Sequence, residues 1–207
     1  MEDILKTITL KAIKNGAFTG TEIMADKIFS IDRVRPLLVL VVRRPGCMLC
    51  REHALEVSRR VHDRTIGGEV DLVGIVKEVA PTKEGVLTDE ELGVGEFQRK
   101  YFRNYPCYVD EEQTFFKIVM GNNLFSMKPY TWNPFTLYKD FRNIQQRMKE
   151  KEITGNLKGD YAIKGGLLLF SKNGTLQLKV DEVVGEDLPY DEIVKAVKDT
   201  LDAEKES

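Results

Sequence analysis

Six consecutive apolar residues, Leu37 to Val42, are followed by a short Arg-Arg-Pro-Gly segment and then by the pair Cys47 and Cys50. An apolar run that is rich in β-branched residues and does not alternate is typical of a central strand covered on both faces. From Cys47 to about His62 the apolar residues take a helical spacing. The sequence therefore predicts a buried strand, a tight turn and a helix, with the first cysteine where the helix begins.

The rest of the chain continues an alternation of strands and helices. A second strand of the buried kind is predicted at Val70–Val76. The other expected elements are two short strands around Asn15-Gly16, a helix at Glu90–Arg103, a helix at Pro134–Lys149, a hairpin of 167–170 and 175–180 that turns at Asn173-Gly174, and a helix from Tyr190 to about Leu201. This order resembles that of the thioredoxin fold with additions, an α/β fold in which helices flank a central mixed sheet.

One segment, at about 121–160, departs from this pattern because aromatic residues and prolines gather in it. Its aromatic residues are Phe125, Tyr130, Trp132, Phe135, Tyr138 and Phe141. We interpret the segment as an insertion that covers the core or supplies an apolar wall over the cysteines. No internal repeat or low-complexity stretch divides the chain, so we expect residues 1–207 to form a single domain.

The composition narrows the classes of function. The chain has 31 basic and 33 acidic residues, a balance that favours neither nucleic acid nor an anionic membrane as a partner. No apolar stretch approaches the roughly 20 residues that span a bilayer. The acidic start, Met1-Glu2-Asp3, is unlike a secretory signal, and three cysteines are too few for a secreted disulfide framework. We therefore expect a cytoplasmic protein without a membrane span.

A Cys-x-x-Cys pair at the start of a helix has a defined redox chemistry. Unpaired backbone N–H groups and the positive end of the helix dipole stabilise a thiolate at the first position. Such placement lowers a cysteine pKa from about 8.5 to roughly 3.5–7.5. Cys50 lies one turn after Cys47 on the same helix face and can close a disulfide with it. We therefore expect Cys47 and Cys50 to be the catalytic residues, with Cys47 the better thiolate.

Charged residues near the two cysteines are candidates for the rest of the site. Ligands of open α/β sheets bind at the carboxyl ends of the strands, and Cys47 follows one such end while Lys77 and Glu78 follow the next. Positive charge beside a thiol lowers its pKa, and three arginines flank the pair. These arginines are Arg43, Arg44 and Arg51. The residues that we expect to stabilise the thiolate or bind substrate are Arg44, Arg51, Lys77 and Glu78.

Three other interpretations of the cysteines stay open. Both can be structural residues of the core, where free cysteine is common. Cys47, Cys50 and His53 also have the spacing C-x-x-C-x-x-H, to which Cys107 can add a fourth zinc ligand. The three share one predicted helix in a positively charged surround, however, and we therefore expect no metal. In the third interpretation Cys107 resolves a more distant disulfide, although a cysteine at the start of a short strand more often belongs to the core.

The other titratable side chains of the predicted helix are expected on its surface. His53 is interpreted as a solvated histidine, with a role in deprotonating Cys50 as the alternative. Glu52 and Glu56 are interpreted as surface charges of the helix. None of the three is counted among the predicted site residues.

The segment from Arg43 to Glu52 resembles the peroxiredoxin-like 2 family, in the alkyl hydroperoxide reductase and thiol-specific antioxidant branch of the thioredoxin superfamily. Two further blocks are similar to that family: Val76-Lys77-Glu78, and Gly155-Asn156-Leu157-Lys158-Gly159-Asp160 followed by Gly165-Gly166. The resemblance covers roughly Pro36 to Val180. It implies a thioredoxin-like fold with antioxidant or redox-regulatory activity. Some members resemble prostamide/prostaglandin F synthases, which reduce a prostaglandin endoperoxide with electrons derived from NADPH.

The sequence departs from the usual peroxiredoxin and thioredoxin patterns. In the peroxiredoxin pattern Pro-x-x-x-Thr-x-x-Cys, aligned on Cys50, Cys47 stands at the threonine and Arg43 at the proline. Lys164-Gly165 stands where many peroxiredoxins have Arg-Gly, and the proline that precedes the later strand of thioredoxins has no counterpart between positions 134 and 189. The thioredoxin likeness favours Cys47 as the attacking thiol and the peroxiredoxin alignment favours Cys50, so both assignments stay open.

The motif and the resemblance together predict a thiol-disulfide oxidoreductase that reduces peroxides or endoperoxides. Cys47 and Cys50 would cycle between dithiol and disulfide, through a sulfenic acid on the attacking sulfur. The sequence lacks a glycine fingerprint for a nucleotide, so we expect no bound cofactor and a separate NADPH-dependent reductase of the thioredoxin or glutathione type. The alternative is a redox-regulated binding protein, in which the disulfide changes the affinity for a partner without turnover.

Overall fold

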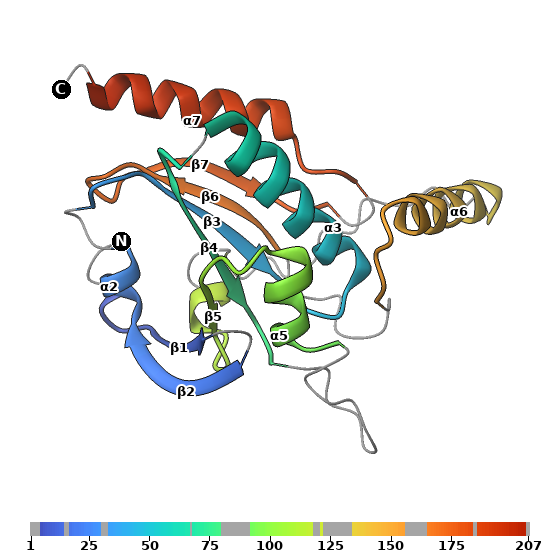
Figure 1. Cartoon of the computed structure of the whole chain (residues 1–207), viewed down its shortest axis with the longest axis horizontal. Coiled ribbons are helices and arrows are strands. Elements are labelled where there is room, and N and C mark those ends of the chain that lie inside the picture. The colour runs from blue at the N-terminus through green and yellow to red at the C-terminus, as the bar shows by residue number, and fades with distance from the viewer. Residues whose placement is uncertain are drawn as a thin grey trace.

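A computed structural model of the chain describes residues 5–14, 17–29, 33–66, 68–79, 92–117, 121, 134–155, 165–183 and 186–205. Its centre is a seven-stranded mixed sheet with the strand order β2-β1-β5-β4-β3-β6-β7 (Figure 1). The strands are β1 (Thr9–Lys14), β2 (Ala17–Met24), β3 (Leu37–Val42), β4 (Asp71–Val76), β5 (Cys107–Val109), β6 (Gly166–Phe170) and β7 (Leu176–Asp181). The predicted α/β fold with a central mixed sheet is confirmed.

Helices cover both faces of this sheet. They are α2 (Ala25–Ile28), α3 (Met48–Glu56), α5 (Val94–Glu96), α6 (Pro134–Glu150) and α7 (Tyr190–Lys205). Two helices continue as π-helical segments, α3 into η1 (Val57–Ile66) and α5 into η2 (Phe97–Tyr101). The helices predicted after Cys47, from Pro134 and from Tyr190 are confirmed, and the last extends one turn beyond its predicted end. The helix expected from Glu90 begins at Val94 within the described residues.

The direction of the strands determines where polar residues gather. β3 pairs in parallel with β4, and β4 with β5. β6 runs antiparallel to β3, and β7 runs antiparallel to β6, so β7 points in the same direction as β3. The residues that follow β3, β4 and β7 therefore emerge at the same end of the sheet.

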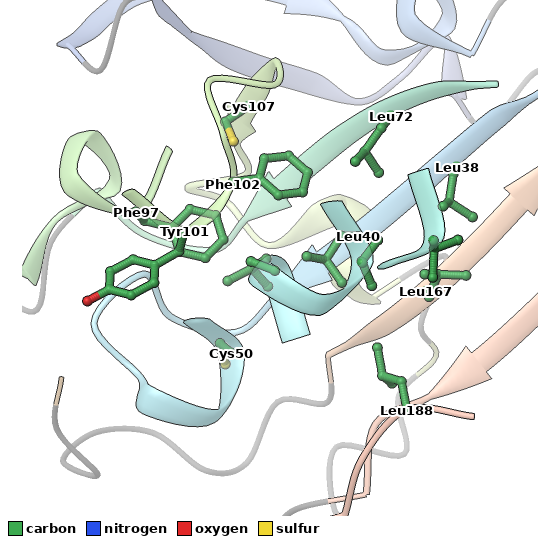
Figure 2. Packing of buried hydrophobic residues seen from close by; sticks show 14 of the residues in the cluster. Leu38, Leu40, Cys50, Leu72, Phe97, Tyr101, Phe102, Cys107, Leu167 and Leu188 are labelled. Carbon is green, nitrogen blue, oxygen red and sulfur yellow. The ribbon is translucent and has the colours of Figure 1, made fainter. Parts of the chain in front are cut away.

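The central strands are covered on both faces, as the unbroken apolar runs predict. Successive residues of a strand point to opposite faces, so β3 contributes Leu38 and Leu40 to one apolar cluster and Leu37 and Val39 to another. The first cluster lies beneath α3, η2 and α7, and Figure 2 shows its packing around Leu40. The second lies against α2. The backbone between the two clusters is thus held in a close-packed core, which gives the turn after β3 a fixed base.

The predicted aromatic-rich insertion at about 121–160 lies only partly within the described residues. Its described part consists of residue 121 and of 134–155, which contain α6. Figure 1 shows α6 to one side of the sheet, where Met148 joins the core and Phe141 is 44% exposed. Phe135 and Tyr138 also lie in α6, whereas Phe125, Tyr130 and Trp132 fall outside the described residues, and a single domain over 1–207 stays a prediction.

Among the helices that the structure describes, none is long and apolar enough to cross a bilayer. The longest, α6, has 17 residues and carries charged side chains along its length. The cytoplasmic location stays a prediction.

Candidate active site

Cys47 occupies the N-cap position of α3, directly after the turn that ends β3. Its backbone is extended, with φ −76° and ψ 125°, and its carbonyl accepts the first hydrogen bond of the helix from the N–H of Arg51 at 3.0 Å. The helix therefore begins at the position that the sequence predicts, because Pro45-Gly46 ends the strand and the cysteine caps the next element. Cys47 and Cys50 are both free thiols, 5% and 3% exposed.

The sulfur of Cys47 is surrounded by groups that stabilise its charged form. It accepts hydrogen bonds from the thiol and from the backbone N–H of Cys50, and the Nη2 atom of Arg43 lies 4.0 Å away. The hydrogen bond from the Cys50 thiol, the Arg43 guanidinium and the Cys50 N–H together lower the pKa of Cys47 to about 6, against the opposing effects of burial and of Glu182. These groups therefore favour the thiolate form of Cys47.

The same arrangement keeps Cys50 protonated. Its hydrogen bond to Cys47, its burial and the negative charges of Cys47 and Glu182 raise the pKa of Cys50 well above its ordinary value, although Arg43 opposes them. The two thiols thus hold different charges at neutral pH. This difference favours Cys47 as the nucleophile and leaves Cys50 as a buried thiol that must lose its proton before it can react.

Beside the thiols lies a charged cluster of Arg43, His53 and Glu182. Arg43 Nη2 donates to Glu182 Oε1 at 2.5 Å, and the Nδ1 atom of His53 lies 3.8 Å from the same oxygen. All three side chains are buried. Two opposite charges removed from water stabilise each other only at close range with good geometry, which the Arg43–Glu182 pair has.

Sequence reasoning did not place Glu182 in the site, although the Gly165-Gly166 block was a signal that pointed to it. Glu182 follows β7, and two antiparallel reversals bring β7 back to the direction of β3. The backbone N–H of Glu182 donates to the carbonyl of Gly165 at 2.9 Å, which ties it to the first residue before β6. A Cβ at Gly165 would lie 2.5 Å from the Glu182 carboxylate and 2.7 Å from the carbonyl of Val41. Only glycine fits there, so the Gly165-Gly166 block makes room for the buried acid.

The prediction that His53 and Glu52 lie on the helix surface is wrong. His53 is 4% exposed and Glu52 is fully buried, because α6 and the 182–190 segment pack over this face of α3. Glu52 Oε1 accepts from Arg147 Nε at 2.8 Å and from Lys151 Nζ at 2.9 Å. The helical pattern of α3 alone did not show that a second layer covers its polar face.

The contacts of Arg51 are with groups other than the thiols, although the sequence analysis grouped it with them. Its guanidinium is fully buried and binds the carbonyl of Pro45 at 2.7 Å, the carbonyl of Thr154 at 2.8 Å and Glu96 Oε2 at 2.7 Å. It also lies over the ring of Tyr101, 4.6 Å from the centroid. Arg51 therefore joins the turn before Cys47, the segment after α6 and the end of α5.

The remaining predicted residues lie at the same end of the sheet. Arg44 Nε pairs with Glu78 Oε1 at 3.3 Å, which joins the turn after β3 to the residue that follows β4. The backbone N–H of Lys77 donates to the carbonyl of Val42 at 3.3 Å, and the Lys77 side chain is buried. The topology thus brings these residues together with Cys47, as expected from the parallel strands, while their roles toward thiolate or substrate stay predictions.

Cys107 belongs to the apolar core. It pairs in register with Gly74 of β4, which pairs with Leu40 of β3, so about 10 Å of sheet separates it from β3. Figure 2 shows it next to Phe102 and away from Cys50, and burial raises the pKa of its thiol. Within the described residues no group of three or more His, Cys, Asp or Glu side chains is arranged to hold a metal ion.

Known proteins similar to this chain are redox proteins. A family model described as AhpC/TSA antioxidant enzyme matches residues 71–182, more than half of the chain. The prostamide/prostaglandin F synthase of Salmo salar is 29% identical over 195 residues, which cover 92% of this chain and 88% of the relative. The prostamide/prostaglandin F synthase of Bos taurus is 30% identical over 162 residues, which cover 77% of this chain and 73% of the relative.

Solved structures show the same fold at low sequence identity. A secreted Mycobacterium tuberculosis disulfide oxidoreductase, described as homologous to E. coli DsbE, has a TM-score of 0.52 at 13% identity and covers 96% of this chain and 99% of its own. The bacterioferritin comigratory protein of Xanthomonas campestris, described with alkyl peroxide reduction activity, has a TM-score of 0.52 at 11% identity and covers 95% of this chain and 94% of its own. These likenesses show a thioredoxin-like fold.

Proposed function

Because the chain belongs to the AhpC/TSA antioxidant enzyme family, we propose that it is a thiol-disulfide oxidoreductase in which Cys47 reduces peroxides or endoperoxides and Cys50 resolves the product. The membership agrees with the resemblance to peroxiredoxin-like 2 proteins. It makes the chain a thiol oxidoreductase of the peroxiredoxin-like type. The proposal adds the substrate class, the residues and their order of action.

The observation that carries this proposal is the position of Cys47 at the N-cap of α3, 4.0 Å from the Nη2 atom of Arg43. Cys47 has its pKa lowered to about 6 by the hydrogen bond from Cys50, by Arg43 and by the backbone N–H of Cys50. The thiolate attacks one oxygen of the O–O bond, and the other oxygen leaves and takes a proton to become an alcohol or water. A hydroperoxide leaves a sulfenic acid on Cys47, and an endoperoxide leaves a sulfenate ester. Cys50 then attacks the Cys47 sulfur and the S–O bond breaks, so that water leaves from the sulfenic acid, or the second alcohol from the ester, as the disulfide forms.

Return of the disulfide to the dithiol needs an external reductant. A dithiol of thioredoxin type, or glutathione, would attack the disulfide through a mixed disulfide and leave oxidised while the pair regains two protons. NADPH would supply that reductant through a separate reductase, and the proposal includes no cofactor bound to this chain. The need for an external reductant is inferred from the family and from the chemistry of the Cys47–Cys50 pair.

The relatives support an endoperoxide as one candidate substrate. They are named prostamide/prostaglandin F synthases and align with most of this chain at 29–30% identity. Alkyl peroxides and endoperoxides share the weak O–O bond that a thiolate breaks, so one site suits both. The two differ in size, and the rates for a small and a large peroxide distinguish them.

The experiment follows thiol loss on the reduced full-length chain after addition of hydrogen peroxide or a lipid hydroperoxide, with mass spectrometry across a pH series. We expect loss at neutral pH that ends in a Cys47–Cys50 disulfide, and turnover when a thioredoxin system is added. The double variant Cys47→Ser, Cys50→Ser should lose turnover, whereas Cys107→Ala should retain it. Unchanged turnover in the double variant contradicts the proposal. Slow thiol loss, with a disulfide formed only by exchange, would instead support the redox-regulated binding protein.

A further inference from the structure

Formation of the disulfide requires a proton to leave a buried thiol. Cys50 is 3% exposed, and its hydrogen bond to Cys47 and its burial raise its pKa well above the ordinary value. Oxidation of Cys47 to the sulfenic acid removes one negative charge beside Cys50, yet the thiol still has little contact with solvent. A base inside the protein is therefore needed close to Cys50.

One small cavity opens on the Cys50 side chain. Its walls are Leu40, Val41, Val42, Cys50, His53, Gly166, Glu182 and Leu188. The cavity has space for about one water molecule, and among the described residues that line it His53 and Glu182 are the titratable ones besides Cys50. A water in a cavity of this size could bridge its polar groups. The chain thus brings a carboxylate and an imidazole to a cavity whose other walls are apolar.

The geometry of His53 and Glu182 leaves a place for one proton between them. His53 Nε2 lies 3.2 Å from the carbonyl oxygen of Glu186, which can only accept, so Nε2 carries a hydrogen. The Nδ1 atom, an acceptor in the neutral ring, then faces Glu182 Oε1 at 3.8 Å. A proton can therefore be taken up between these two acceptors without a rearrangement of the backbone.

The charges around the pair come from three elements. Arg43, after β3, binds Glu182 Oε1 at 2.5 Å and lies 4.0 Å from the Cys47 sulfur. Cys50 and His53 come from the first two turns of α3, and Glu182 follows β7. Arg43 neutralises the carboxylate, so the cluster can take up one proton and become positive, or release it, near the sulfur that reacts.

We propose that His53 and Glu182 act together as the buried proton acceptor for Cys50 during disulfide formation, and as its proton donor when the disulfide is reduced. This inference rests on the proposed function. The proton of Cys50 moves through the cavity to the His53–Glu182 pair, and the Cys50 sulfur bonds to the Cys47 sulfur. The S–O bond of the sulfenic acid breaks, and the leaving hydroxide takes a proton from solvent to form water, so the pair keeps the proton of Cys50. Reduction by an external dithiol reverses the direction of the proton. Both residues act on Cys50 rather than on the peroxide.

The charge of Glu182 gives this inference a test with opposite outcomes. As a negative charge alone, Glu182 raises the pKa of both cysteines, so Glu182→Gln would make Cys50 easier to ionise and disulfide formation faster. As part of the proton acceptor, Glu182→Gln makes the same step slower. The reduced full-length variant is mixed with hydrogen peroxide, and dimedone trapping with mass spectrometry separates sulfenic acid from disulfide.

We expect Glu182→Gln and His53→Gln to form the sulfenic acid on Cys47 but to convert it to disulfide at least tenfold more slowly at pH 7. Matched controls are His62→Gln, a buried histidine at the other end of the same helical stretch, and Glu204→Gln, a paired carboxylate of α7. Both controls should resolve at the rate of the unaltered chain. A rate that stays equal or increases in Glu182→Gln and His53→Gln overturns the inference.

The pH dependence of the unaltered chain provides a second readout should a variant fail to fold. With an internal acceptor, the rate of disulfide formation levels off near neutral pH, whereas in the variants it rises tenfold per pH unit up to pH 9. A rise of that kind in the unaltered chain overturns the inference, because hydroxide would then be the base. If no sulfenic acid forms on the unaltered chain at any pH, the proposed function fails instead, and the two failures are distinguishable.

Discussion

The guanidinium of Arg43 lies 4.0 Å from the sulfur of Cys47, and both groups are buried. The turn Arg44-Pro45-Gly46 lies between these two residues and reverses the chain. Arg43, just after the strand, therefore faces Cys47, at the N-cap of the helix. The same guanidinium binds Glu182, so a single cation serves both the Glu182 side chain and the sulfur of Cys47. A positive charge thus reaches the nucleophile from the arginine that follows β3.

Replacing Arg43 by glutamine should raise the pKa of Cys47, because a favourable charge is removed from a buried thiolate. We expect alkylation of Cys47 by iodoacetamide at pH 6.5 to slow by about threefold, which corresponds to a rise of one pKa unit from about 6. Arg43→Lys keeps a cation and should retain more of the rate, and Lys11→Gln on β1 serves as the distant control. An unchanged rate in Arg43→Gln would show that the helix end and Cys50 alone stabilise the thiolate.

The hydrogen bond from Cys50 makes a separate prediction for the pH profile of Cys47. With its pKa lowered to about 6, Cys47 is a thiol below that pH and a thiolate above it, so its alkylation rate should rise through pH 6 and level off by pH 7. Cys50→Ala removes the donor and should move this rise to higher pH, whereas Cys50→Ser keeps an O–H donor and should move it less. Identical profiles for the two variants would exclude the hydrogen bond as a cause.

The fold was largely predictable because its signals are local. The apolar run of β3, the Pro45-Gly46 break and the Asn173-Gly174 turn each determine the conformation of their own residues. Side-chain alternation within β3 and β6 then follows from the strand geometry alone. The position of Cys47 at the start of α3 depends on the same local signals, and for this reason the centre of the candidate site was found without a structure.

The surroundings of the thiols were not predictable because they depend on which elements pack against α3. Glu52 and His53 carry the residue types of a solvated helix face, and only the arrival of α6 and of the 182–190 segment buries them. Glu182 lies 132 residues after Cys50 in the sequence. The antiparallel pairing of β7 with β6 brings it back to the cysteines. Arg51 resembled a partner of the thiolate by its position in sequence, but its donors point to Pro45, Thr154 and Glu96.

Arg51 should hold the active-site turn in place. Its replacement by methionine removes a buried donor from the carbonyls of Pro45 and Thr154, and leaves Glu96 with the half-exposed Lys100 in place of a buried cation. Breaking a buried ion pair from one side costs about 3–5 kcal/mol, so we expect the free energy of unfolding in urea to fall by that amount. The double variant Arg51→Met, Glu96→Gln should recover part of the loss. A change below about 1 kcal/mol would mean that the pair behaves as an exposed one.

Glu52 and Glu56 provide a matched pair for the attachment of α6. Both carboxylates bind Lys151 Nζ, at 2.9 Å and 2.8 Å, but the Glu52 side chain is fully buried whereas that of Glu56 is 25% exposed. We expect Glu52→Gln to reduce the free energy of unfolding by about 3–5 kcal/mol, because Arg147 and Lys151 lose a buried partner. Glu56→Gln should cost about 0–1 kcal/mol, because water screens that pair. Equal losses in urea titrations would contradict a role for burial.

Cys107 should remain a thiol throughout the redox cycle. Its side chain is 1% exposed, burial raises the pKa of its thiol, and it lies two strands away from β3 in the sheet. A disulfide requires the Cα atoms of its two cysteines to lie within about 7 Å, and Figure 2 shows Cys107 beside Phe102 and away from Cys50. After oxidation by hydrogen peroxide, peptide mapping should find one disulfide, Cys47–Cys50, with Cys107 alkylated only when the protein is denatured first. The Cys107→Ala variant should form the same disulfide at the same rate. A disulfide from Cys107 to either of the other cysteines would show instead that the sheet opens during the cycle and that Cys107 takes part in resolution.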